Sequence, residues 1–248
     1  PNFEAPADAN ADNVYVVVVQ VSDGSLVDTQ TLSVTVTNAN EPPLITSNGG
    51  GVTASVGAAE NQTAVTTVTS SDVDGGAAVY SIAGGADAGL FTINASTGAL
   101  TFVAAPDFEA PADAGADNVY DVTVQVSDGN GGTDTQAIAV TVTNVNETPV
   151  IISAAAVSAA ENQTAVTTVT SSDVDGGAPV YTIVGGADGA LFSIDSATGV
   201  LTFNSAPDFE APADAGADNA YDVTGQGADG NGGTATQAIA VTVTNVNE

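Results

Sequence analysis

The eight glutamates of the sequence fall into three recurring motifs, whose side chains are of the kind that binds hard cations. The motifs are Glu-Asn-Gln-Thr-Ala-Val at 60–65 and 161–166, (Asp/Asn)-Phe-Glu-Ala-Pro at 2–6, 107–111 and 208–212, and Thr-Asn-X-Asn-Glu at 37–41, 143–147 and 244–248. Carboxylate and amide oxygens are the ligands that Ca²⁺ selects. Glutamates that served solubility alone would be scattered over exposed strand positions, so this clustering favours cation sites.

Aspartates add to the same pattern. Asp-Val-Asp occurs at 72–74 and 173–175, and Asp128 and Asp229 begin two Gly-rich loops. The chain has 30 acidic residues, no Lys, Arg or His, and a formal net charge of −30. Without cationic side chains, a cluster of carboxylates is costly unless a multivalent cation lies among them. The alternative interpretation is an acidic surface that is merely solvated, as in halophilic proteins.

The composition excludes several classes of function. No residue can neutralise a phosphate, which excludes nucleic acid as a partner and disfavours an anionic membrane surface. No apolar run is long enough to span a bilayer. The chain has no Cys, His or Lys, so it cannot form a catalytic Cys–His or Ser–His pair or a Schiff-base lysine. A pair of carboxylates could in principle hydrolyse a glycoside, but the candidates recur in every repeat, so we predict that the chain is not an enzyme.

Internal repeats define the domain organisation. Glu60 and Glu161 lie 101 residues apart, as do the Phe-Glu-Ala-Pro motifs that begin at Phe108 and Phe209. The sequence therefore predicts the C-terminal half of one repeat at 1–42 and two full repeats at 43–148 and 149–248. About 100 residues is the size of one β-sandwich domain.

Within a repeat, apolar residues alternate with polar ones. In 120–126, the residues Tyr120, Val122, Val124 and Val126 share one parity, which is typical of a strand with one buried face. Similar strands are expected at 65–69, 79–82, 90–93, 99–103 and 138–143, with 14–21 and 32–36 in the leading half-repeat. About seven short strands per repeat predict an all-β chain of tandem Greek-key sandwiches. The last repeat carries Gly225 and Gly227 in place of the core valines Val124 and Val126, which the sequence does not explain functionally.

The order of these motifs resembles the cadherin-like repeats of bacterial surface proteins, over both full repeats and the leading partial one. The segment at 144–147 resembles the cadherin inter-domain linker, with Asn in place of its first Asp and Glu in place of its second. The acidic pair of 107–109, the Asp-Val-Asp of 72–74 and the glutamate at 60 match further elements of the family.

The resemblance implies Ca²⁺ clusters at the joints between consecutive repeats, with these ligands. The first joint would use Asn2, Glu4, Asn38, Asn40, Glu41, Asp72, Asp74 and Asp128. The middle joint would use Glu60, Asp107, Glu109, Asn144, Asn146, Glu147, Asp173, Asp175 and Asp229. The last repeat would offer Glu161, Asp208, Glu210, Asn245, Asn247 and Glu248. Asn in place of Asp lowers the ligand charge, which implies fewer ions or weaker binding. An EF-hand at 72–83 is a poor match, because its twelfth position is Ala83.

The resemblance implies an extracellular, bacterial, structural or adhesive module whose joints are stiffened by Ca²⁺. The alternative function is a carbohydrate-binding module, but the chain has no Trp and its tyrosines lie within strand patterns. The residues at 1–42 supply only two strands with an apolar face, which needs a partner. Two explanations are open: a longer covalent array of repeats, or a filament in which neighbouring copies complete the half-domain by strand addition.

Overall fold

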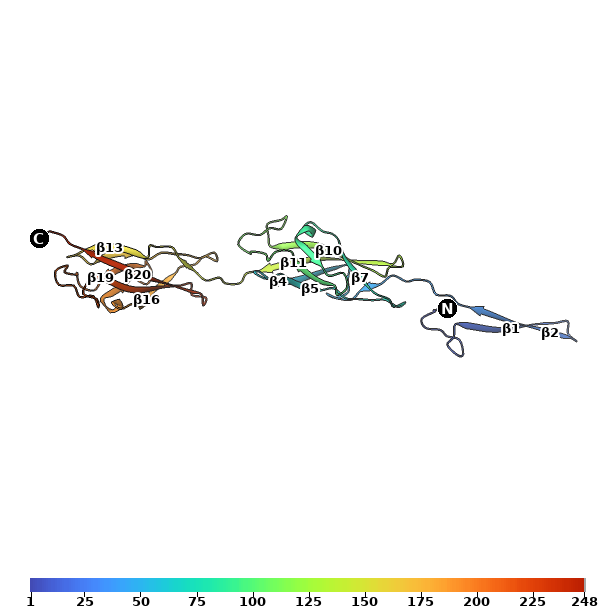
Figure 1. The fold of residues 1–248 in the computed structure, drawn as a ribbon. Helices are drawn as coiled ribbons and strands as arrows, with labels where there is room; N and C mark the ends of the chain where they lie inside the picture. Colours follow the sequence, from blue (N-terminus) through green and yellow to red (C-terminus); the bar gives the residue numbers. More distant parts are fainter. Residues whose placement is uncertain (248) are drawn as a thin grey trace. The chain divides into compact units, whose positions relative to one another are not determined.

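The computed structural model describes residues 1–247, and its regular secondary structure is almost entirely β (Figure 1). The leading hairpin consists of β1 (Val14–Ser22) and β2 (Val27–Thr35). The next sandwich consists of β3 (Leu44–Ile45), β4 (Thr53–Ala59), β5 (Ala64–Thr67), β6 (Ser70–Ser71), β7 (Val79–Gly84), the 3₁₀ helix η1 (Ala88–Leu90), β8 (Phe91–Ile93), β9 (Ala99–Phe102), β10 (Val119–Ser127) and β11 (Thr133–Thr143). The prediction of an all-β chain with cadherin-like or Ig-like sandwiches is confirmed.

The last sandwich repeats this order element by element. It consists of β12 (Val150–Ile151), β13 (Ala156–Ala160), β14 (Ala165–Thr168), β15 (Ser171–Ser172), β16 (Val180–Gly185), η2 (Gly189–Leu191), β17 (Phe192–Ile194), β18 (Val200–Phe203), β19 (Ala220–Ala228) and β20 (Thr234–Thr244). By internal contacts the chain divides into two compact units, 1–144 and 145 onward. The finer division at residues 42 and 148 stays a prediction.

Each sandwich pairs a four-stranded sheet with smaller sheets. In the first unit the order is β4-β11-β10-β7, facing the three-stranded sheet β5-β9-β8, with a short β3-β6 pair beside them. The Gly-rich loop that begins at Asp128 joins β10 and β11 as a hairpin, in which Ser127 pairs with Thr133. One pairing differs from the antiparallel pairing typical of the predicted Greek-key sandwich: β4 runs parallel to β11, with Ala137 opposite Thr53. Alternation predicts a buried face but says nothing about strand direction.

The core of the first unit follows the predicted alternation. Along β10, Tyr120, Val122, Val124 and Val126 are at most 1% exposed. The ring of Tyr120 packs edge-on against Phe102, with centroids 5.2 Å apart. Because aromatic rings bury large areas in fixed geometry, this cluster anchors one sheet to the other.

Tyr120 also fixes the loop that carries the Asp-Phe-Glu motif. Its hydroxyl oxygen accepts a hydrogen bond from the N–H of Ala112 at 3.1 Å. The amide Nδ2 of Asn118 donates to the carbonyl oxygen of Phe108 at 2.9 Å. These contacts tie the 107–118 loop to the start of β10 and so place the acidic pair at one end of the sandwich.

The β1–β2 hairpin has no second sheet over it in the described residues. Val17, Val19 and Val21 occupy the positions of Val122, Val124 and Val126, yet they are 50%, 49% and 69% exposed. The strands predicted at 14–21 and 32–36 correspond to β1 and β2. Their apolar face is exposed to solvent.

Candidate metal centre

The first joint brings together residues from four distant segments of the first unit. The amide Nδ2 of Asn38 donates to Oδ1 of Asp74 at 2.7 Å, and the N–H of Glu41 donates to Oδ2 of the same carboxylate at 2.7 Å. The amide Nδ2 of Asn40 donates to Oδ2 of Asp128 at 2.7 Å. The linker at 37–43 is thus held by both acidic elements that the sequence predicts for this joint.

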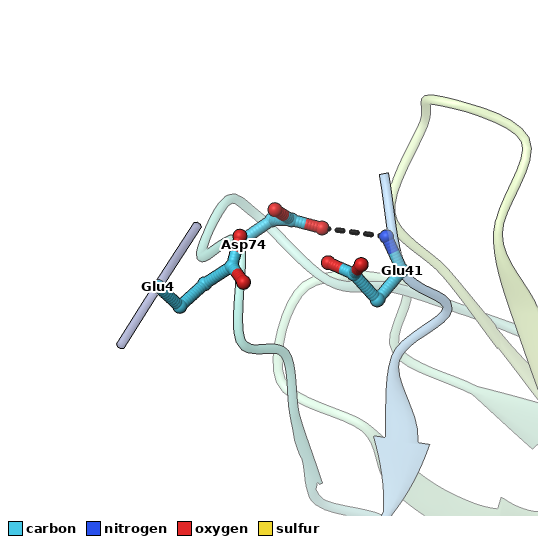
Figure 2. A group of neighbouring side chains, drawn as sticks. All are labelled: Glu4, Glu41 and Asp74. Carbon is cyan, nitrogen blue, oxygen red and sulfur yellow. Dashed lines mark hydrogen bonds between the residues drawn. The ribbon is translucent and has the colours of Figure 1, made fainter. Parts of the chain in front are cut away.

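Three carboxylates converge here. Glu4, Glu41 and Asp74 each present an oxygen, and these oxygens all lie within 4.8 Å of one another. Figure 2 shows the three side chains turned toward a shared space, with Asp74 bound to the Glu41 backbone. A separation of this order is short enough for one ion to contact all three groups, since Ca²⁺–oxygen distances are about 2.3–2.6 Å.

Glu41 has the clearest need for a cation. Its Oε2 is buried and has no hydrogen-bond partner among the described residues. Burial, followed by the charges of Glu4 and Asp74, raises the pKa of the Glu41 carboxyl above its ordinary value. When the Glu41 carboxylate is ionised at neutral pH, its negative charge needs a cation nearby, and the chain has no Lys, Arg or His to supply one. The donor set therefore fits a hard cation.

The pKa values of two partner acids shift the other way. The N–H of Glu41 and the amide of Asn38 hold the pKa of Asp74 below its ordinary value. The amide of Asn40 does the same for the pKa of Asp128, and together with the N–H groups of Asn130 and Gly132 it outweighs the opposing effect of burial. Both groups stay ionised at neutral pH, as cation ligands must.

Two further predicted ligands of this joint make hydrogen bonds within the turns beside the cluster. Oδ1 of Asn2 accepts hydrogen bonds from the N–H groups of Glu4 and Ala5, at 2.9 and 3.2 Å. Oδ1 of Asp72 accepts one from the N–H of Asp74 at 2.9 Å. These two residues shape the turns that present Glu4 and Asp74.

The residues predicted for the middle joint fall in both compact units, so each group is described within its own unit. In the first, oxygens of Glu60, Asp107 and Glu109 lie within 4.8 Å of one another. Oε2 of Glu60, a residue only 3% exposed, accepts the N–H of Phe108 at 2.8 Å. Asn144 donates its amide to Oε1 of Glu109 at 3.0 Å.

In the second unit, the linker residues bind the next acidic elements. The N–H of Glu147 donates to Oδ2 of Asp175 at 2.7 Å, and the amide of Asn146 donates to Oδ2 of Asp229 at 2.8 Å. Oδ2 of Asp173 is buried with no hydrogen-bond partner in the described part of the chain. This arrangement repeats the linker contacts of the first joint.

The last repeat carries the equivalent of the Glu60 group. Oxygens of Glu161, Asp208 and Glu210 lie within 4.8 Å of one another, and the amide of Asn245 donates to Oε1 of Glu210 at 2.5 Å. The N–H groups of Val246 and Phe209 lower the pKa of Glu161. Asn247 is exposed, and Glu248 lies outside the described residues.

Two buried aspartates were missed by the sequence interpretation. Asp87 is 5% exposed, and its carboxylate accepts the N–H groups of Ala114 and Asp121, at 2.7 and 2.8 Å. Asp113 is 6% exposed, and burial raises its pKa, but the N–H groups of Asp117 and Asn118 outweigh that effect and lower it. Both hold the loop at the end of the sandwich. Their recurrence 101 residues later, as Asp188 and Asp214, was the signal available in the sequence.

The alternative of a glycan site gains no support from the tyrosines of the two full repeats. Tyr80, Tyr120, Tyr181 and Tyr221 are 8%, 1%, 5% and 1% exposed, so their faces are used by the cores. Among the described residues, no helix is both long and apolar enough to cross a membrane.

Comparisons with known proteins agree with the fold. The sequence profile of the bacterial Ig domain matches residues 40–141. The chain is 34% identical to human Protocadherin Fat 4 over 158 residues, 59% of this chain and 3% of that protein. It is 38% identical to Halomucin of Haloquadratum walsbyi over 92 residues, 35% of this chain and 1% of that protein. The matched part of the chain thus corresponds to only 3% and 1% of the length of these two relatives.

A solved structure shows the same fold. EC1-2 of human protocadherin-24 superposes with a TM-score of 0.57 at 21% identity, covering 84% of this chain and 100% of that one. These matches are Ig-like and cadherin-like domains, which are non-enzymatic in kind. The chain therefore has a cadherin-like β-sandwich fold.

Proposed function

We propose that the chain is a segment of an extracellular, bacterial, structural or adhesive protein whose joints are stiffened by Ca²⁺. The observation that carries this proposal is the Glu4–Glu41–Asp74 cluster, in which a buried glutamate oxygen has no hydrogen-bond partner among residues 1–247 and the chain has no cationic side chains. The similarity to Protocadherin Fat 4 and Halomucin supports the extracellular setting. The ions would neutralise the clustered carboxylates and fix the linkers between repeats.

Titration of the intact chain with Ca²⁺ tests the metal proposal. Extracellular Ca²⁺ modules bind with dissociation constants on the order of 10⁻⁴–10⁻³ M. Isothermal calorimetry should show binding in this range, and chelation should increase inter-domain flexibility in small-angle scattering while the sandwich cores persist. Glu41→Gln should weaken binding at the first joint roughly tenfold, because one anionic ligand is lost.

Asp28→Asn is the matched control. It removes the same charge from an exposed position on β2, away from the cluster, and should leave Ca²⁺ affinity unchanged. A merely solvated acidic surface predicts instead that the two variants behave alike and that NaCl replaces Ca²⁺. Equal affinities for the two variants, or scattering curves unaffected by chelation, would exclude the metal-joint proposal.

We further propose that the open face of the β1–β2 hairpin is covered by strands of further repeats or of a neighbouring copy. In the complete sandwich, the equivalent valines of β10 are at most 1% exposed, so the hairpin lacks the same cover. Denaturing electrophoresis of native material separates the two sources. Very large polypeptides indicate a covalent array, and a single band near 24 kDa indicates subunits of this size. A monodisperse monomer in native solution, with residues 14–35 protected from hydrogen exchange, would contradict both.

A further inference from the structure

Three Asn-Gly-Gly tripeptides occur in the chain, at 48–50, 130–132 and 231–233, and the structure gives them different surroundings. Asn followed by Gly is the dipeptide most prone to spontaneous deamidation, because glycine leaves its own backbone nitrogen unhindered, and Asn is among the thermolabile residues. With the same two residues following each Asn, differences in reactivity must come from structure.

Asn130 and Asn231 lie at the tips of the hairpins that join β10 to β11 and β19 to β20. Both are exposed, and Gly131 and Gly232 have φ of +107° and +111°. The backbone N–H of each Asn is fixed by the preceding aspartate: Asn130 donates to Oδ1 of Asp128, and Asn231 to Oδ1 of Asp229, both at 2.7 Å. Neither side-chain amide makes a hydrogen bond within the part of the chain that the structure describes, so each is free to rotate.

Asn48 is held at both ends of its amide. Its Nδ2 donates to Oε1 of Gln136 at 3.3 Å, and its Oδ1 accepts the hydroxyl of Thr66 at 3.2 Å. Gln136 is itself completely buried and donates to the carbonyl oxygen of Gly51 at 2.8 Å. Asn48 must therefore break two hydrogen bonds to a rigid neighbourhood before its side chain can turn toward Gly49.

We propose that Asn130 and Asn231 are sites of spontaneous deamidation and that the fold protects Asn48. In the reaction the deprotonated backbone nitrogen of the following Gly attacks Cγ of the Asn side chain. The new C–N bond closes a succinimide ring, the Cγ–Nδ2 bond breaks, and ammonia leaves. Water then opens either carbonyl of the ring and yields aspartate or isoaspartate.

The modification changes the loop that holds a linker. Asp128 accepts the N–H of Asn130 through Oδ1 and the amide of Asn40 through Oδ2. An isoaspartate at Asn130 adds one methylene to the backbone two residues after Asp128. Both products, aspartate and isoaspartate, add a negative charge to a chain of charge −30. Deamidation therefore accumulates with time at Asn130 and Asn231, whose N–H groups bind the aspartates that also hold the linkers.

Incubation of the intact chain at mildly alkaline pH tests the proposal, with peptide mass spectrometry after Glu-specific or chymotryptic cleavage, because the chain has no Lys or Arg for trypsin. Deamidation at Asn130 and Asn231 should be roughly ten- to thirtyfold faster than at Asn48, as expected from two hydrogen bonds that must first break. Isoaspartate methyltransferase should label the same two peptides. Equal rates at the three sites, or a faster reaction at Asn48, would overturn the proposal.

Two comparisons keep the test specific to structure. In concentrated urea the three rates should converge, because the tripeptides are identical; a difference that persists there would show that the folded surroundings are not the cause. Thr66→Val removes the donor to Oδ1 of Asn48 and should accelerate deamidation at Asn48 severalfold while leaving Asn130 unchanged. No acceleration, in a variant whose core hydrogen exchange is intact, would contradict the protective role of this contact.

Discussion

The two complete sandwiches have the same architecture, but the core of one lacks two side chains. Phe91 and Phe102 stack at 4.7 Å, and the equivalent Phe192 and Phe203 stack at 4.6 Å. The strand order is also the same in both. Yet Val124 and Val126, both fully buried, are replaced by Gly225 and Gly227 on the core face of β19.

The difference shows that those two valines are not needed to specify the fold. β19 still pairs with β20 over nine residues, and Tyr221 is still 1% exposed. Neither glycine is required by a close approach of its neighbours: a Cβ on Gly225 would lie 3.7 Å from Cδ1 of Ile239, and one on Gly227 would lie 3.6 Å from Cε1 of Tyr181. These are ordinary contact distances, so glycine there costs packing and gains nothing in space.

The largest expected effect is produced by transferring the glycines to the first sandwich. Val124→Gly with Val126→Gly should lower the free energy of unfolding of residues 44–143 by roughly 4–6 kcal/mol, from lost burial, a residual cavity and glycine in a strand. Hydrogen-exchange mass spectrometry should show β10 and β11 losing protection. As a control, Gln125→Gly removes an outward-facing side chain of the same strand and should cost only about 1 kcal/mol. Equal effects of the two changes would show that core packing does not distinguish the sandwiches.

The reverse transfer should have a smaller effect. Gly225→Val with Gly227→Val should stabilise the last sandwich by roughly 2–3 kcal/mol, less than the reverse loss because the surroundings must readjust to the added side chains. Denaturant unfolding and exchange protection of β19 should both increase. Gln226→Val, on the outward face between the two glycines, should change stability by less than about 0.5 kcal/mol. Destabilisation by the double valine variant would indicate that the last core has closed over the glycines.

Sequence alternation predicted the strands of the core well and those with small residues poorly. β10 and β11 were expected from their buried valines, whereas β4 was not, because Thr53, Ser55 and Gly57 give weak contrast with the residues between them. Its parallel pairing with β11 is a tertiary choice that local periodicity does not encode. The single turns η1 and η2 are too short to show a helical period.

The candidate site was predictable where several acidic or amide side chains lie close together in a short motif that recurs in each repeat. Glu60 and the Asp-Val-Asp elements were expected, and the structure places them at the ends of the sandwiches. Asp87 and Asp113 looked like ordinary loop residues, since their burial depends on N–H groups donated by residues far along the chain or across a loop. The use of Asn2 and Asp72 as turn-forming residues likewise depends on local geometry that the motif does not show.

The smallest predicted effect concerns the turns that follow β8 and β17, where the two sandwiches differ by one charge. Oδ1 of Asn94 accepts the N–H groups of Ser96 and Thr97, both at 3.0 Å. In the last sandwich Asp195 accepts the N–H of Thr198 at 2.8 Å and its hydroxyl at 2.9 Å. The N–H and hydroxyl groups of Thr198 hold the pKa of Asp195 below its ordinary value of 3.8. An amide has no such titration, so only the second turn should respond to acid.

Because the folded pKa of Asp195 is depressed, its contribution to stability is fully present above pH 3.8 and is lost as the pH falls through the folded value. In an NMR titration from neutral pH to well below 3.8, the amide proton of Thr198 should shift with an inflection below that value, while the amide of Thr97 stays flat. Asp195→Asn should abolish the inflection, and Asn94→Asp should create one at Thr97. The core amides of both sandwiches serve as the control, since they should not move in the same pH range. Parallel titration of Thr97 and Thr198 in the wild-type chain would mean that the response comes from the general charge of the protein and not from this carboxylate.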